Sequence, residues 1–66
     1  MRIVLNGEDH ELPEGSTVTD LLAHLELGGR RVAVEVNKAI VRRADHEAHK
    51  LADGDLVEVV TLVGGG

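Results

Sequence analysis

The spacing of hydrophobic residues changes along the chain, and the first segment alternates as a strand does. The segment RIVLNG is rich in β-branched residues and ends in Asn-Gly, a dipeptide typical of tight hairpin turns. We therefore predict strands over residues 2–6 and 8–12. Ile3 and Leu5 should share one face of the first strand, because successive side chains in a strand point to opposite sides.

A helical period replaces this alternation after Pro13. Thr17 and Asp20 have the spacing of a capping box, which predicts the start of a helix. We interpret Gly28-Gly29 as the C-cap at which this helix ends. Apolar residues spaced i, i+3, i+4 and i+7 predict one buried helix face, formed by Val18, Leu21, Leu22 and Leu25.

The second half of the chain contains three further strand patterns. Alternating valines predict a strand over 30–37 with those valines facing the core, and AIV predicts a short strand over 39–41. A polar stretch that extends to residue 55 shows no clear period. The sequence LVEVVTLV predicts the last strand, over 56–63, with Val57 and Val59 on one face and Glu58 and Val60 on the other.

The order strand, strand, helix, strand, short strand, strand predicts an α+β fold. One helix packed on one face of a mixed four- or five-stranded sheet would bury all of these apolar faces. This arrangement is the β-grasp, or ubiquitin-like roll, in which the first and last strands form a central parallel pair. We expect one domain over residues 1–63 and a flexible glycine tail over 64–66.

Composition narrows the range of functions. The 66 residues include no cysteine, Phe, Tyr or Trp, and the formal net charge is -5. A disulfide, a thiolate metal site and a thiol nucleophile are therefore excluded, and the basic or aromatic surface that nucleic acid requires is missing. No signal peptide or bilayer-spanning apolar stretch is evident. We expect a cytoplasmic monomer with neither membrane nor nucleic-acid partners.

Side chains with catalytic or metal-binding potential do not form an enzyme motif. His46 and His49 could share a face beside Asp45 or Glu47, but a third convergent ligand is missing, so we predict no metal site. Ser16 has no neighbouring base. We interpret all four histidines, His10, His24, His46 and His49, as solvated surface residues. The sequence predicts a protein that is not an enzyme and holds no permanent cofactor.

The final residues, TLVGGG, offer a different chemistry. A terminal carboxylate is ionised at neutral pH and unreactive until it is activated, for instance as an acyl-adenylate. Gly65 and Gly66 have no β-carbons, so an extended backbone could enter the narrow nucleotide site of another enzyme. We predict Gly66 as the reactive residue and Gly65 as the access residue. The predicted docking residues are Gly64, Val63 and Leu62, and we predict a further partner surface at Val60 and Glu58.

Five segments, taken together, resemble the ThiS family, the sulfur carriers of thiamine biosynthesis. They are IVLNGE, STVTDLL, VAVEVNKAIV, LADGDLVEVV and the final VGGG, so the resemblance extends over essentially the whole chain. The resemblance implies that a ThiF-type adenylating enzyme uses MgATP to form a glycyl adenylate at Gly66. Sulfur relayed as a persulfide from a cysteine desulfurase would then replace AMP, leaving a thiocarboxylate (1-thioglycine). A ThiG-type thiazole synthase would accept that sulfur into the thiazole ring.

The chain departs from the family pattern at two positions, and three alternatives remain open. Arg42 stands where the family commonly has proline and His46 where it has an aromatic residue, which concerns the loop and partner surface rather than the tail. MoaD, the small subunit of molybdopterin synthase, also ends in Gly-Gly and delivers sulfur to a pterin precursor. A ubiquitin-like modifier would join Gly66 to a target lysine. A non-reactive interaction domain would not need Gly65 and Gly66.

Overall fold

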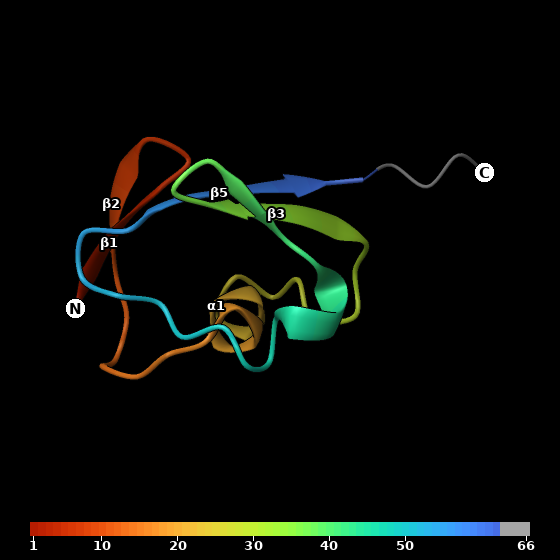
Figure 1. Ribbon diagram of the computed structural model, residues 1–66, viewed down its shortest axis with the longest axis horizontal. Helices are drawn as coiled ribbons and strands as arrows, with labels where there is room; N and C mark the ends of the chain where they lie inside the picture. The colour runs from red at the N-terminus through yellow and green to blue at the C-terminus, as the bar shows by residue number, and fades with distance from the viewer. Residues whose placement is uncertain (63–66) are drawn as a thin grey trace.

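The computed structural model describes residues 1–62 and places one helix against one face of a five-stranded sheet. In order, the elements are β1 (Arg2–Leu5), β2 (Glu8–Glu11), α1 (Val18–His24), β3 (Val32–Val36), β4 (Ala39–Val41), the 3-10 helix η1 (Arg43–Asp45) and β5 (Leu56–Thr61). Figure 1 shows the sheet on one side of α1 and the segment between β4 and β5 passing beside the helix. Within the described residues, no helix is long and apolar enough to cross a membrane. The predicted tail, residues 64–66, lies outside them.

Strand β5 lies at the centre of the sheet, which has the order β2-β1-β5-β3-β4. On one side it pairs in parallel with Val4 and Leu5 of β1, and on the other it pairs antiparallel with the whole of β3. The predicted parallel pairing of the first and last strands is therefore confirmed, as is the mixed sheet with one main helix. All of the predicted strands are present, although most are one or two residues shorter than predicted.

In each of the two hairpins, a two-residue turn with a left-handed backbone joins the strands. Asn6 and Gly7 have φ angles of 50° and 85°, and Asn37 and Lys38 have φ angles of 53° and 70°. Positive φ at both central residues is the type I′ pattern, whose twist matches that of the flanking strands. Asn-Gly tolerates this conformation well, whereas the β-carbon of Lys38 makes it less favourable there.

The helix α1 begins as predicted. The Asp20 N–H donates to the Thr17 hydroxyl over 3.2 Å, and the Asp20 carboxylate accepts the Thr17 N–H over 2.9 Å, so the capping box is confirmed. The N–H groups of the first two helical residues donate to the backbone carbonyls of His49 and His46, over 3.0 and 3.2 Å. The segment between β4 and β5 therefore satisfies donors that a helix start leaves unpaired.

The end of the helix differs from the prediction, because α1 stops at His24 and Gly28-Gly29 is not its C-cap. Glu26 has a φ of 59°, and the N–H groups of Glu26 and Leu27 donate to carbonyls of the last helical turn over 3.0 and 2.8 Å. These two bonds form a Schellman motif with Glu26 at the left-handed position where glycine is usual. The motif is favoured here because Leu27 packs against the core cluster that contains Leu22.

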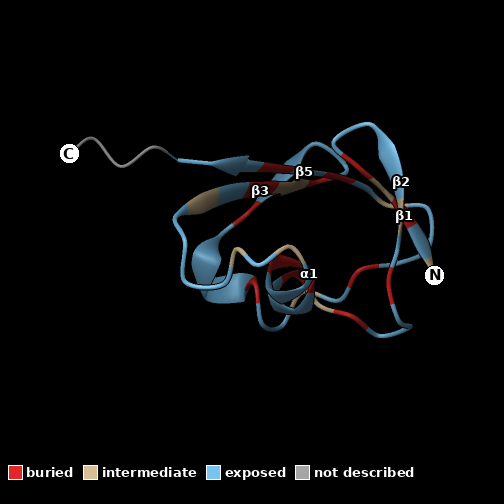
Figure 2. Ribbon diagram, turned by 180° about the vertical axis from the view of Figure 1, so that it is seen from behind, coloured by how far each residue is buried: buried red, intermediate tan, exposed pale blue. Residues whose placement is uncertain are grey.

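The core lies between the sheet and α1 and is entirely aliphatic. Figure 2 shows the buried residues on the facing sides of the helix and the central strands. Of the predicted inward-facing residues, Leu25 and Val32 are only partly buried, and the others belong to the buried core. The buried hydrophobic residues are Ile3, Leu5, Leu12, Val18, Leu21, Leu22, Val34, Val36, Val41, Leu51, Val57 and Val59. Such residues stabilise the fold by roughly 1.5–3 kcal/mol each when fully removed from water.

The polar segment between β4 and β5 is anchored at two points although its sequence shows no period. His46 is 7% exposed, and its Nε2 lies 3.0 Å from the carbonyl of Val41, which can only accept a hydrogen bond. Leu51 is buried, and its N–H donates to the Ser16 carbonyl over 2.8 Å. The interpretation of His46 as a solvated surface residue is therefore wrong, because its ring ties this segment to β4.

Candidate functional site

Strand β5 is hydrogen-bonded along its length up to the last described residue. Thr61 lies opposite Val32 in the ladder, and the Leu62 N–H donates to the Arg31 carbonyl over 2.9 Å. The sheet therefore fixes the path of the chain to Leu62, two residues before the predicted tail begins at Gly64. Four of the predicted site residues, Val63, Gly64, Gly65 and Gly66, lie outside the described residues.

Two asparagine side chains from the hairpin turns fasten β5 to its neighbours. The Asn6 amide donates to the Val59 carbonyl over 3.2 Å and accepts the Val59 N–H over 3.0 Å, which extends the β1–β5 ladder by side-chain bonds. On the opposite side of β5, the side-chain oxygen Oδ1 of Asn37 accepts the Leu56 N–H over 3.0 Å. Sequence analysis predicted the turns but not these bonds, because they join residues far apart in the chain.

The predicted alternation of β5 is confirmed. Val57 and Val59 are buried, whereas Glu58 is exposed and Val60 is 57% exposed on the face away from the helix. Glu58 lies directly opposite Glu35 of β3, so two carboxylates adjoin on this outer face. The role of Val60 and Glu58 as a partner surface stays a prediction.

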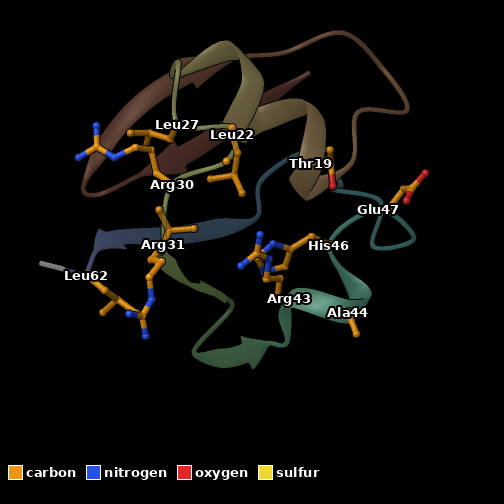
Figure 3. Close-up of a pocket in the computed structure, with 13 residues that line it drawn as sticks. Thr19, Leu22, Leu27, Arg30, Arg31, Arg43, Ala44, His46, Glu47 and Leu62 are labelled. Atoms are coloured by element: carbon orange, nitrogen blue, oxygen red, sulfur yellow. The ribbon is translucent and has the colours of Figure 1, made fainter. Parts of the chain in front are cut away.

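A groove of about 630 Å³ opens beside Leu62, between the loop that follows α1 and the segment that follows β4. Figure 3 shows Arg43 and His46 extending into the groove, Arg31 running alongside Leu62, and Arg30 pointing outward at the rim. Apolar side chains form part of the lining, namely Leu22, Leu27 and Val32. The groove is basic and partly apolar. The predicted docking residue Leu62 lines it and is 47% exposed.

Sequence analysis missed the three arginines of the groove. They are three of only seven Lys and Arg residues in a chain whose net charge is -5. Within residues 1–62 none of them forms an ion pair, since the salt bridges found there join the N-terminal ammonium to Glu11 and Arg2 to Asp9. The available signal was two Arg-Arg dipeptides in an acidic chain, at 30–31 and 42–43.

The histidines do not form a metal centre with the other described residues. In this part of the chain, no group of three or more His, Cys, Asp or Glu residues could hold a metal ion. His10 and His24 lie edge to face with ring centroids 6.3 Å apart, a pairing that sequence analysis did not predict. The His10 Nε2 is buried without a hydrogen-bond partner among the described atoms.

Comparisons with known proteins agree on one family. The model of the ThiS family matches residues 3–66. A sulfur carrier protein ThiS from Bacillus subtilis is 40% identical over 63 residues, which cover 94% of this chain and 96% of that protein. The crystal structure of a thiamine biosynthesis protein (ThiS) from Geobacter metallireducens superposes with a TM-score of 0.84 at 33% identity, with complete coverage of both chains. This match confirms the β-grasp fold.

A longer relative carries a similar segment as part of a larger protein. A thiazole synthase from Magnetococcus marinus is 46% identical over 66 residues, which cover all of this chain but only 20% of that protein, so the chain spans about a fifth of the relative's length. The family match over almost the whole sequence, the close relative of equal length and the shared fold lead to one conclusion. The chain belongs to the ThiS family.

Proposed function

We propose that this protein is a sulfur carrier whose Gly66 carboxylate is converted to a thiocarboxylate that donates sulfur to the thiazole ring of thiamine. The observation that carries the proposal is the continuity between β5, which is hydrogen-bonded through Leu62, and the final Val-Gly-Gly-Gly of the sequence. A rigid sheet followed, after Val63, by three residues without β-carbons can present a backbone carboxylate to a narrow site. Membership of the ThiS family supports the choice of sulfur as the cargo.

The chemistry requires three steps, and other molecules supply the reagent for each. A carboxylate oxygen of Gly66 would attack the α-phosphorus of MgATP in a ThiF-type adenylating enzyme, releasing pyrophosphate and forming a glycyl adenylate. The terminal sulfur of a persulfide would then attack the acyl carbon and displace AMP. A thiol would reduce the resulting S–S bond and leave the thiocarboxylate. The carrier is the substrate in each step, and its own contribution is to present the carboxylate.

The proposed acceptor is a thiazole synthase of the ThiG type. Two longer relatives that contain a segment similar to this chain are named thiazole synthase, which supports this partner. The persulfide donor and the adenylating enzyme rest on the family resemblance. No resident cofactor is needed, because the sulfur is carried on the acyl carbon.

Intact mass spectrometry tests the proposal. The protein is incubated with MgATP, the adenylating enzyme, a cysteine desulfurase, cysteine and a thiol. The mass should rise by the difference between one sulfur and one oxygen atom, and the added mass should map to Gly66. A variant that lacks Gly66 is the control and should keep its mass, because any gain there would place the sulfur elsewhere.

The same experiment separates the alternative functions. Conjugates with target proteins on a denaturing gel, without a thiocarboxylate, would instead identify a ubiquitin-like modifier. A thiocarboxylate that is consumed by a pterin precursor but not by a thiazole synthase would favour the MoaD-like function. Full thiazole formation by a carrier that lacks Gly65 and Gly66 would exclude any role for the tail.

A further inference from the structure

The groove beside Leu62 concentrates positive charge where the chain leaves the sheet. We propose that it docks an acidic and partly apolar segment of the protein that receives the tail, and this proposal rests on the proposed function. Arg30, Arg31 and Arg43 would bind the carboxylates of that segment, and the apolar lining would contact its hydrophobic side chains.

The charges identify the chemistry of the partner. The three guanidinium groups form no ion pair with a described carboxylate, and all three residues are exposed. A guanidinium binds a carboxylate through two parallel hydrogen bonds, so exposed and unpaired arginines favour acidic ligands. The carboxylate of Glu47 lies at the opposite rim and points away from the arginines in Figure 3.

Because the chain as a whole is acidic, the groove should direct an acidic partner to one place on the surface. Because the net charge is -5, most of the surface repels an acidic partner, and attraction is concentrated where the arginines gather. An acidic segment would therefore be guided to the side of the molecule from which the tail emerges. Like-charge repulsion elsewhere would disfavour wrong orientations.

The apolar lining favours a polypeptide over a small anion. Leu22 and Leu27 line the groove together with Leu62, which remains 47% exposed. A phosphate ion would use the arginines and leave the exposed Leu62 side chain in water. A segment that carries both acidic and aliphatic residues would use both, as the apolar core and polar rim of a protein interface do.

The tail of the same molecule is a weaker candidate for this groove. Residues 63–66 could span at most roughly 13 Å when fully extended, and they follow Leu62, which lines the same groove as the arginines. Three of these residues are glycines, however, and ordering them would cost more backbone entropy than an exposed ion pair gains. A preformed segment of a partner avoids most of that cost.

Docking at this groove would set the register of the tail in the partner. The Arg31 carbonyl accepts the Leu62 N–H, so the groove wall and the residue that lies two positions before the tail belong to the same hydrogen-bonded unit. Contacts here would strengthen association without touching the reacting carboxylate. We therefore expect an effect on the KM for the carrier and none on kcat.

The first test measures binding directly, by titrating the ¹⁵N-labelled protein with a capped peptide of alternating Glu and Leu. Amide shifts should centre on residues 30–32 and 43–47 and should weaken as NaCl is added. The double variant Arg31→Gln/Arg43→Gln should bind the peptide roughly fivefold more weakly. The matched control Lys38→Gln/Arg42→Gln removes the same charge from residues that do not line the groove and should change affinity by less than about twofold.

Three outcomes of this titration would overturn the proposal. They are equal binding of a Gln-Leu peptide, equal weakening in the matched control, and shifts centred on Val60 of the outer face. A further outcome would also reject the proposal. If deletion of Gly66 changes the Arg31 and Arg43 signals of the free protein, the tail is the occupant of the groove. The titration needs no enzyme, so it tests whether the groove binds an acidic segment even if the proposed function is wrong.

The second test uses ATP–pyrophosphate exchange by the adenylating enzyme. The groove variant should raise the KM for the carrier roughly fivefold at unchanged kcat, with a smaller salt dependence than the wild type, and the matched control should not. An unchanged KM would contradict docking of the enzyme at the groove. Absence of exchange with the wild-type carrier would reject the proposed function itself, which is a distinct result.

Discussion

The groove is lined by Leu62, which directly follows β5, and by the segment between β4 and β5, and these two parts of the chain owe their order to different kinds of contact. β5 pairs with β3 from Val57 to Thr61 and with β1 at Leu56 and Val57, and two asparagine side chains tie it further. The segment has a single turn of 3-10 helix and depends on the buried side chains of His46 and Leu51 and on bonds to the start of α1. The strand that leads to the tail is therefore held by a continuous ladder with β3, whereas the segment that carries Arg43 depends on a few anchors.

Loss of the Leu51 side chain should have the largest effect. Leu51 is 5% exposed, and Leu51→Ala would leave a cavity under the segment, costing about 3 kcal/mol of the free energy of unfolding. A domain of this size has a total of only ~3–5 kcal/mol, so the variant should be partly unfolded at room temperature. Urea and thermal unfolding measure this cost.

The control for Leu51 is a leucine on the outer face. Leu56 is 48% exposed, and Leu56→Ala should cost less than about 1 kcal/mol. If both variants lose the same stability, the irregular segment does not depend on its buried anchor, and the contrast with β5 is wrong.

His46 should be the next most sensitive position. His46→Ala would remove buried packing and leave the Val41 carbonyl without its donor, which should cost about 2 kcal/mol. His46→Phe keeps an aromatic ring but not the hydrogen bond and should cost about 1 kcal/mol. Chemical denaturation gives both values. In either variant the amide signals of Arg43 should shift while those of β5 stay unchanged, and general perturbation of β5 would argue against separate anchoring of the strand and the segment.

The strands were predictable from sequence because short local patterns of residues indicate where each strand lies. Alternating valines in β3 and β5 mark which side chains face the core, and the Asn-Gly dipeptide marks the first turn. The capping box at Thr17 uses residues three positions apart, so it too is visible in one short window. The outward orientation of Val60 and Glu58 followed from the same period of two.

The missed features depend on contacts between residues far apart in the chain. His46 is polar and lies in a segment without a period, so nothing local indicated that its ring reaches the Val41 carbonyl. The helix ends at a Schellman motif with Glu26 at the left-handed position, although two glycines stand just beyond it. The basic groove brings residues 30–31 next to residue 43 only in the folded chain.

A substitution of Asn6 should weaken the attachment of β5, with a smaller loss of stability than His46→Ala. Asn6→Gly keeps a residue that adopts positive φ but removes both side-chain bonds to Val59, which should cost about 1.5 kcal/mol. Hydrogen exchange of the Val59 amide should accelerate, and exchange in the segment after β4 should not. Asn6→Ala separates the two contributions, because a β-carbon at this φ should cost about 1 kcal/mol more than glycine. Equal losses for both variants would mean that the turn does not require its left-handed backbone.

The smallest expected effect is a gain in stability on the outer face. Glu58 and Glu35 lie directly opposite each other, and like charges in that position are destabilising. Glu58→Gln should therefore add about 0.4 kcal/mol to the free energy of unfolding at low salt. NaCl screens this repulsion, so the gain measured by urea denaturation should fall as salt is added. Glu14→Gln removes the same charge from an exposed turn and should leave stability nearly unchanged, which separates local repulsion from net charge. A loss of stability in Glu58→Gln would show that this carboxylate helps to hold β5, whereas a gain would mean that β5 is held well enough to carry two adjoining carboxylates.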